Sequence, residues 1–179
     1  MGLGLAALLL LGLLLLASCS GESNGDVAPS APGEHAGRAW LDVELQDVMT
    51  GERFRISDFS GRPVFVESFA VWCPTCRSQL LEMKEVLERT DAVLVALDTD
   101  PNENEQKVRE HVVRNGFTGH FAVAPSELTS ELLEEFGPEI VAVPAAPVVL
   151  VSEDQSRARL LERGVKSADA LTEVLEEDQ

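Results

Sequence analysis

The sequence has few cysteines, little basic charge and no apolar run of full membrane-spanning length. Three of its 179 residues are Cys, too few for a scaffold held together by disulfides, and a chain of this length can bury a core without them. Its 14 Lys and Arg are outnumbered by 31 Asp and Glu, for a formal net charge of −17. This balance argues against nucleic acid as a partner, because a densely negative duplex needs a basic face. It also argues against docking on an anionic membrane through a basic patch.

The longest apolar run is at the N-terminus. Residues 3–17 are almost all Leu, Ala and Gly, shorter than the about 20 residues that span a bilayer but suited to the h-region of a signal peptide. The run ends in Leu16-Ala17-Ser18-Cys19, which resembles the lipobox of secreted lipoproteins and implies cleavage before Cys19 and lipidation of its thiol. No Lys or Arg precedes the run, which departs from that pattern, and an uncleaved anchor is the alternative. Either interpretation predicts attachment to the membrane.

The chain therefore divides into three predicted parts. Residues 1–18 are a signal peptide of the lipoprotein type, and residues 19–37 are a lipid-anchored flexible tether. Gly, Ser, Pro and Ala dominate residues 20–37, and no periodic apolar face is present there, so this segment buries too little to fold. Residues 38–179 form the folded domain. The predicted location is the cell membrane, with the domain lipid-anchored on the extracytoplasmic face.

Strand and helix patterns alternate along the folded part. Residues 64–69 and 92–97 are apolar and β-branched or aromatic, as central strands covered on both faces are. Further strands are expected at 40–45, 54–56, 120–124, 147–152 and 158–161, and helices after Cys76 and at 103–115, 126–136 and 167–176. This alternation predicts an α/β fold with a central mixed β-sheet flanked by helices.

The motif that carries chemistry is Cys73-Pro74-Thr75-Cys76, after a predicted strand and at the start of a predicted helix. Thiols three residues apart on a helix lie about 5–6 Å apart between β-carbons, so small adjustments can open or close a disulfide. Free N–H groups at the helix N-terminus stabilise a Cys73 thiolate, and Pro74 suits the first turn. We expect Cys73 to attack a partner's disulfide, and the less exposed Cys76 to release the reduced partner.

Half of a zinc site is the alternative interpretation of such a cysteine pair. A closed site needs two more ligands, yet the third cysteine, Cys19, lies in the leader, and neither His111 nor His120 has a partner at ligand spacing. We therefore expect no metal. A C-x-x-C motif between a buried strand and a helix has the context of a thioredoxin-like redox motif.

Residues 69–76, Phe-Ala-Val-Trp-Cys-Pro-Thr-Cys, resemble the active-site segment of the thioredoxin superfamily. The anchor, the tether and residues 57–63 resemble its extracytoplasmic branch, the TlpA- and ResA-type thiol-disulfide oxidoreductases. The resemblance covers about residues 40–179. It implies a thioredoxin-like fold with an extra strand–helix unit within residues 92–124, and an enzyme without a cofactor. The partners it implies are disulfide-containing extracytoplasmic proteins and a membrane electron donor.

Glu67 interrupts an otherwise apolar strand before the cysteine motif. An ionised carboxylate is costly inside a core, so we expect burial to raise its pKa. Its position also matches the buried acid beneath the active site of thioredoxins. That resemblance implies a catalytic role for Glu67 in moving the proton of Cys76. The alternative is an exposed Glu that pairs with an Arg.

The resemblance also implies a cis-proline opposite the active site, whose preceding residue offers backbone groups to the bound partner. Two dipeptides fit, Val143-Pro144 and Ala146-Pro147. We favour Pro147, because choosing Pro144 would place Pro147 inside a central strand, where its missing N–H breaks the ladder. The expected partner-binding residues are Trp72, Pro74, Ala146 and Pro147.

The predicted function is a membrane-tethered extracytoplasmic thiol-disulfide oxidoreductase that reduces partner proteins through the Cys73/Cys76 dithiol. Reduction is favoured because the Pro-Thr dipeptide holds no cation to make Cys73 a very stable thiolate, as in strong oxidants. A copper-handling assembly factor on the same fold is one alternative, although it would need C-x-x-x-C and a distant His. A non-catalytic binding module is the other. A copper titration and an insulin-reduction assay separate these three classes.

Overall fold

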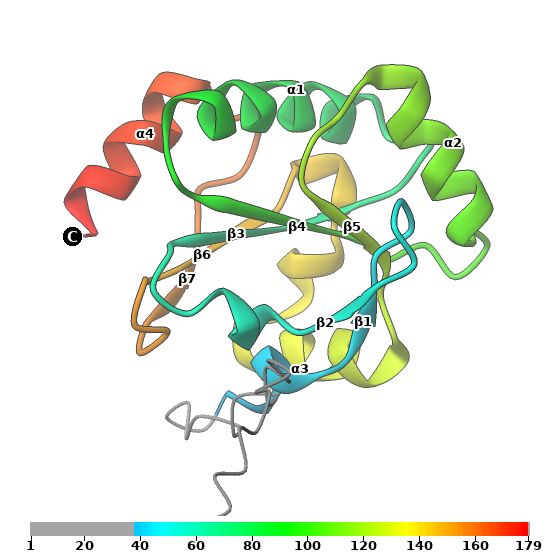
Figure 1. The fold of residues 1–179 in the computed structure, drawn as a ribbon, viewed down its shortest axis with the longest axis horizontal. Coiled ribbons are helices and arrows are strands. Elements are labelled where there is room, and N and C mark those ends of the chain that lie inside the picture. Colours follow the sequence, from blue (N-terminus) through cyan, green and yellow to red (C-terminus); the bar gives the residue numbers. More distant parts are fainter. Residues whose placement is uncertain (1–37, 179) are drawn as a thin grey trace, which may run out of the picture.

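The computed structural model describes residues 38–178, which are built around a five-stranded sheet (Figure 1). In spatial order its strands are β5 (His120–Val123), β4 (Val93–Asp98), β3 (Val64–Phe69), β6 (Val148–Val151) and β7 (Ala158–Leu160). β3, β4 and β5 are parallel, whereas β6 pairs antiparallel with β3, and β7 with β6. The predicted mixed sheet is confirmed. The predicted signal peptide, Cys19 and the tether lie outside the described residues.

Helices cover both faces of the sheet (Figure 1). One face carries α1 (Pro74–Arg89), α2 (Glu105–Asn115) and α4 (Ala168–Glu177), and the other carries α3 (Ser126–Phe136) with the short helix η1 (Ala39–Asp42). Residues 92–124 supply β4, α2 and β5. No helix within residues 38–178 combines the length and the hydropathy that a bilayer crossing requires.

β3 has buried side chains on both faces, which explains its nearly continuous apolar sequence. Phe65 and Phe69 belong to the core under α1, α2 and α4, whereas Val64 and Val66 belong to the core on the α3 side. Because side chains alternate along a strand, Glu67 shares the face of the two phenylalanines. The sequence thus places one carboxyl group beneath the helix that carries the cysteines.

The start of α1 is set by its first residues. Cys73 is the N-cap, with Sγ in the place of the usual cap oxygen, accepting a hydrogen bond from the N–H of Cys76 at 3.1 Å. Pro74 opens the helix, where its missing N–H costs nothing. The redox motif and the helix start are therefore one local structure.

The strand predicted at residues 40–45 is wrong over most of its length. Residues 39–42 form η1, and only β1 (Leu45–Gln46) pairs, with β2 (Arg53–Phe54). Trp40 and Leu41 are both buried in the same core. A strand would send adjacent side chains to opposite faces, so a helical turn is needed to bury both.

Other short helices replace predicted loops and turns. η2 (Ile56–Phe59) follows β2, and η3 (Pro138–Val141) and η4 (Val143–Ala145) connect α3 to β6. η4 brings the chain back to the start of α1. This return positions the backbone that faces the cysteines.

Candidate active site

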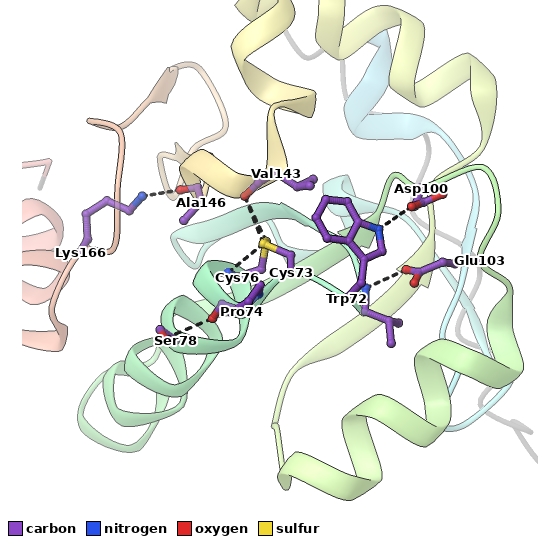
Figure 2. The surroundings of a disulfide bond; sticks show 11 residues. Trp72, Cys73, Pro74, Cys76, Ser78, Asp100, Glu103, Val143, Ala146 and Lys166 are labelled. Atoms are coloured by element: carbon purple, nitrogen blue, oxygen red, sulfur yellow. Dashed lines mark hydrogen bonds between the residues drawn. A yellow bond between two sulfur atoms is a disulfide. The ribbon is translucent and has the colours of Figure 1, made fainter.

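Cys73 and Cys76 form a disulfide at the N-terminus of α1, with a Cα–Cα distance of 5.3 Å (Figure 2). Each residue is 1% exposed. The expectation that Cys76 is less exposed than Cys73 is therefore wrong for the oxidised form. The cause is η4, because its Val143 carbonyl lies against both sulfur atoms rather than against Cys76 alone.

Backbone groups distinguish the two sulfur atoms. The N–H of Cys76 donates to Cys73 Sγ, and the carbonyl oxygen of Val143 lies 3.1 Å from Cys76 Sγ and 3.5 Å from Cys73 Sγ. In the disulfide neither sulfur carries a proton, so the Val143 carbonyl contacts the sulfur atoms without accepting a hydrogen bond from them. After reduction, a Cys76 thiol in this place can donate to Val143, while Cys73 keeps its N–H donor. An N–H donor favours a thiolate and a carbonyl acceptor favours a thiol.

Trp72 lies beside the disulfide and is held by acidic side chains (Figure 2). The residue is 57% exposed, and its indole N–H donates to Asp100 Oδ2 at 2.6 Å. The N–H of Val71 donates to Glu103 Oε2 at 2.7 Å. A hollow of about 290 Å³, the Trp72 hollow, lies next to this ring and is lined by Ala70, Trp72, Asp100, Asn102, Val141 and Val143.

The prediction of a cis-proline is wrong, because residues 38–178 contain no cis peptide bond. The residue that faces the disulfide is Val143, before Pro144, rather than Ala146, before Pro147. Ala146 is buried in the left-handed region, with φ 48°. Its N–H donates to Val143 and its carbonyl accepts from Lys166, so its backbone is already bonded.

Pro147 precedes β6, as expected, but its carbonyl accepts from the N–H of Ser68 at 3.2 Å. Its carbonyl is therefore bonded at the end of the sheet, and its contact role stays a prediction. Pro74 is exposed at the start of α1, beside the cysteines. Of the four residues expected to contact a partner, the structure places Trp72 and Pro74 at the disulfide surface and buries Ala146 away from that surface. The contact roles of Trp72 and Pro74 stay predictions.

Glu67 is fully buried on β3, and neither carboxyl oxygen has a hydrogen-bond partner among the described residues. This contradicts the alternative of an exposed Glu paired with an Arg. Burial raises the pKa of Glu67 well above its ordinary value, and the nearby Lys166 ammonium offsets part of that shift. The catalytic role of Glu67 remains a prediction.

Lys166 is a site residue that the sequence pattern did not reveal. It lies in the loop before α4, and Nζ donates to the carbonyls of Ala146, Gly164 and Glu162. Burial lowers the pKa of Lys166 to about 8, against the opposing effect of Glu67. Nothing in the local sequence connects residue 166 with residue 67, because their proximity depends on how the loop before α4 lies against α1.

Asp98 and Glu103 are also site residues that the sequence analysis missed. Asp98 ends β4 and is buried, although it comes from a strand that reads as apolar. The Asp-Thr-Asp-Pro-Asn-Glu run at residues 98–103 is a concentration of acids directly after a buried strand. This run was the sequence signal for these two residues. Because β3 and β4 are parallel, their carboxyl ends lie at the same edge of the sheet, so acids that follow β4 lie near the cysteines that follow β3.

A disulfide of this type, at the start of a helix on a sheet of this topology, defines a thiol-disulfide oxidoreductase with a thioredoxin-like fold. The chain belongs to the Redoxin family, whose model matches residues 26–167.

Several solved structures share the fold. A secreted disulfide oxidoreductase of Mycobacterium tuberculosis matches with a TM-score of 0.62 and 13% identity over 77% of this chain and 97% of that one. A thiol:disulfide interchange protein of Chlorobium tepidum matches with a TM-score of 0.63 and 18% identity, covering 76% and 92%. StoA of Bacillus subtilis matches with a TM-score of 0.55 and 22% identity, covering 72% and 92%.

One curated relative adds little detail. An uncharacterized protein of Haemophilus influenzae is 34% identical over 50 residues, which is 28% of this chain and 31% of that protein. The matched segment thus spans about a third of that relative's length.

Proposed function

We propose that this protein reduces disulfide bonds of partner proteins outside the cytoplasm while tethered to the membrane through lipidated Cys19. The observation that carries the proposal is the unequal bonding of the two sulfur atoms. Cys73 accepts the N–H of Cys76 at the helix N-terminus, and Cys76 faces the carbonyl of Val143. The first arrangement favours an attacking thiolate and the second a thiol that reacts later.

The reaction begins with the reduced protein. The Cys73 thiolate attacks one sulfur of the partner's disulfide, the partner's S–S bond breaks, and its other sulfur leaves as a thiolate. Cys76 then loses its proton and attacks Cys73 Sγ, which breaks the mixed disulfide and releases the second partner thiolate. Two electrons pass to the partner, and the protein is left with the Cys73–Cys76 disulfide. A thiol-bearing electron donor in the membrane restores the dithiol.

Glu67 is proposed as the group that accepts the Cys76 proton. It lies on the face of β3 that packs beneath α1 and carries no competing hydrogen bond within residues 38–178. Its raised pKa brings the carboxyl closer to a thiol in proton affinity, which favours proton transfer between them. The positive charge of Lys166 stabilises the Glu67 carboxylate and so opposes part of the rise in its pKa.

The reductive direction is supported by the charges around Cys73. Pro74 and Thr75 carry no cation, and the side chains bonded to Val71 and Trp72 are the acids Glu103 and Asp100. Negative charge near a thiolate makes the reduced form less stable. Strong oxidants instead have a stabilised reduced form, so this environment favours a reductant.

The decisive experiment is the Cys76→Ser variant. It leaves Cys73 free to form a mixed disulfide that no second thiol can resolve, so partners should accumulate as Cys73 adducts in membranes of the host. Cys73→Ser is the matched control and should trap none. Adducts that form equally on Cys76 in Cys73→Ser would reverse the assigned roles.

The capacity to catalyse disulfide reduction is tested on the same protein. The wild-type domain should accelerate insulin reduction by dithiothreitol, and the double variant Cys73→Ser/Cys76→Ser should not. Failure of the wild type in this assay would contradict the reductive proposal.

A further inference from the structure

The disulfide cover, which consists of residues 143–146, closes the redox site from the side of η4 (Figure 2). Its Val143 carbonyl lies against both sulfur atoms, and each cysteine is 1% exposed. The same carbonyl accepts the N–H of Ala146 at 2.9 Å, and the carbonyl of Ala146 accepts Lys166 Nζ at 2.5 Å. Lys166 thus bonds the residue whose N–H holds the carbonyl at the disulfide.

The loop before α4 bonds the disulfide cover at a second point. The N–H of Gly164 donates to the carbonyl of Ala145 at 2.8 Å. The Lys166 ammonium also donates to the carbonyls of Gly164 at 2.8 Å and Glu162 at 3.3 Å, so its three N–H donors meet three carbonyls. Hydrogen bonds from a charged donor are stronger than those between neutral groups. The ammonium therefore joins this loop to the disulfide cover.

The backbone of Lys166 is fixed on the helix that carries the cysteines. Gln79 follows Cys76 by about one turn of α1 and is fully buried. Its side-chain oxygen accepts the N–H of Lys166 at 2.7 Å, and its amide donates to the Lys166 carbonyl at 3.1 Å. Lys166 therefore has its main chain on α1 and its side chain on the disulfide cover, so it bridges the two sides of the redox site.

The conformation of Ala146 shows why the disulfide cover needs such a bond. Ala146 is buried in the left-handed region, with φ 48° and ψ 60°. The Cβ of a non-glycine residue disfavours this region, and such a residue stays there only where its surroundings hold it. The bonds of Ala146 to Val143 and Lys166 provide that hold. Losing the bond to Lys166 favours relaxation of Ala146 and movement of the cover away from the sulfur atoms.

We infer that Lys166 is a positioning residue of the redox site, which holds the disulfide cover and its Val143 carbonyl against the two sulfur atoms from an anchor on α1. In the oxidised protein this bridge keeps both sulfur atoms buried. In the reduced protein it keeps the carbonyl where the Cys76 thiol can donate to it, which favours the thiol over the thiolate. The bridge is a property of the structure alone, whereas its consequence for exchange with partners rests on the proposed function.

Hydrogen exchange of the Ala146 amide in the oxidised protein tests the bridge directly, because this N–H bonds the Val143 carbonyl. Lys166→Met keeps an unbranched side chain of similar length and removes the donors. Below pH about 8, where Lys166 is charged, the variant should lower the protection of the Ala146 amide by about ten- to a hundred-fold, the factor that corresponds to a hydrogen bond from a charged donor. The amides of β3 should keep their protection, because the opening is local.

Two further variants control this comparison. Lys84→Met removes a Lys of α1 that makes no hydrogen bond to the disulfide cover in the part of the chain that the structure describes, so Ala146 protection should stay the same. Lys166→Gln removes the charge but keeps a polar side chain, and it should lower Ala146 protection even if Lys166→Met does not fold. An Ala146 amide without protection in the wild type, or an equal loss at Ala146 and in β3, would overturn the inference.

The reactivity of the two thiols separates positioning from charge. After brief iodoacetamide treatment of the reduced protein, mass mapping gives the ratio of Cys76 to Cys73 alkylation. Lys166→Met should raise this ratio about three- to ten-fold, because Cys76 loses the carbonyl that favours its thiol. Loss of a nearby positive charge alone would destabilise the Cys76 thiolate and lower the ratio. An unchanged or lowered ratio would therefore refute the positioning role.

Insulin reduction by the wild-type protein keeps this inference distinct from the proposed function. If insulin is not reduced while Lys166→Met still lowers Ala146 protection, the proposed function fails and the bridge stands. If insulin is reduced and Ala146 protection does not depend on Lys166, the proposed function stands and the inference fails.

Discussion

Cys73 and Cys76 are buried to the same extent, yet they differ in the backbone groups that they meet. One sulfur accepts an N–H at the start of α1, and the other faces a carbonyl from η4. Solvent exposure therefore does not assign the roles of the two thiols in this protein. The assignment depends on which protonation state each backbone group stabilises, and a helix N-terminus gives the first cysteine of the motif the N–H.

Glu67 and Lys166 form the one pair in the described core in which burial shifts both groups toward their neutral forms. Burial raises the pKa of Glu67 and lowers that of Lys166 to about 8, and each charge partly offsets the shift of the other. The buried Glu67 carboxyl releases its proton more readily when the Lys166 ammonium is charged. Lys166 is thus the residue that adjusts the proton affinity beneath the cysteines.

Glu67→Gln should stabilise the protein increasingly as pH rises. The folded pKa of Glu67 lies above the unfolded value of 4.5, so above that pH the unfolded chain has released a proton that the folded chain still holds. Wild-type stability therefore falls as pH rises toward the folded pKa, by at most about 1.4 kcal/mol per pH unit. Urea unfolding at acidic and alkaline pH measures the difference, and Glu88→Gln, on the exposed side of α1, should show none. A pH-independent difference for Glu67→Gln would contradict a buried titrating carboxyl.

The same variant also separates a proton acceptor from a structural carboxyl. Gln cannot take the Cys76 proton, so release of a preformed mixed disulfide should slow about ten-fold or more, within the range of general base catalysis. The slowing should grow at higher pH, where wild-type Glu67 is ionised. Rapid-quench measurement of mixed-disulfide decay follows this step. An equal rate for both proteins across pH would mean that the proton leaves through water.

At the scale of elements, one side chain joins α1 to the loop before α4. Gln79 is fully buried, its amide donates to the carbonyl of Lys166 at 3.1 Å, and its oxygen accepts the N–H of Lys166 at 2.7 Å. Because Gln79 pairs with both backbone groups of Lys166, the loop before α4 is fixed against α1. This contact sets where the Lys166 side chain can reach.

Gln79→Ala should lower the free energy of unfolding by about 2–4 kcal/mol, because two hydrogen bonds are lost and two buried backbone groups are left without partners. It should also extend to higher pH the loss of stability that Glu67 causes, since the Lys166 charge that lowers the Glu67 pKa loses its fixed place. Ser78→Ala is the control: Ser78 is exposed and bonds only within its own helix. Denaturation curves of both variants give the comparison, and equal stabilities would show that Gln79 does not fix the loop.

The elements themselves were largely predictable from local patterns. Residues 64–69 have the sequence of a buried strand because both faces of β3 are covered. Gly116 was the expected stop signal for α2, and it ends that helix in the left-handed conformation, with φ 65°. The strand predicted at residues 40–45 is wrong because Trp40 and Leu41 fit a strand composition but enter one core together. Composition shows which residues are apolar, but whether two neighbouring side chains enter the same core depends on the tertiary structure.

At the scale of the molecule, the candidate site is assembled from distant segments. Cys73 and Cys76 were evident because their motif is contiguous. Val143 comes from the connection between α3 and β6, Glu103 from the loop between β4 and α2, and Lys166 from the loop before α4. No spacing rule links these positions. Their convergence follows from the strand order and from helix packing, so the sequence alone predicts the cysteine chemistry but not the residues that surround it.

The proposed anchor belongs to the scale of the whole chain, because it would decide where the redox domain works. If Cys19 carries the lipid, Cys19→Ala should either leave an uncleaved precursor, with a correspondingly larger mass, or release the protein from the membrane. The predicted leader is shorter than the about 20 residues that span a bilayer, so without lipid it should hold the domain weakly. Intact-mass measurement and detergent partitioning compare the variant with the wild type, and Ser20→Ala is the neighbouring control. An unchanged mass and unchanged partitioning for Cys19→Ala would show that the N-terminus anchors the protein without lipidation.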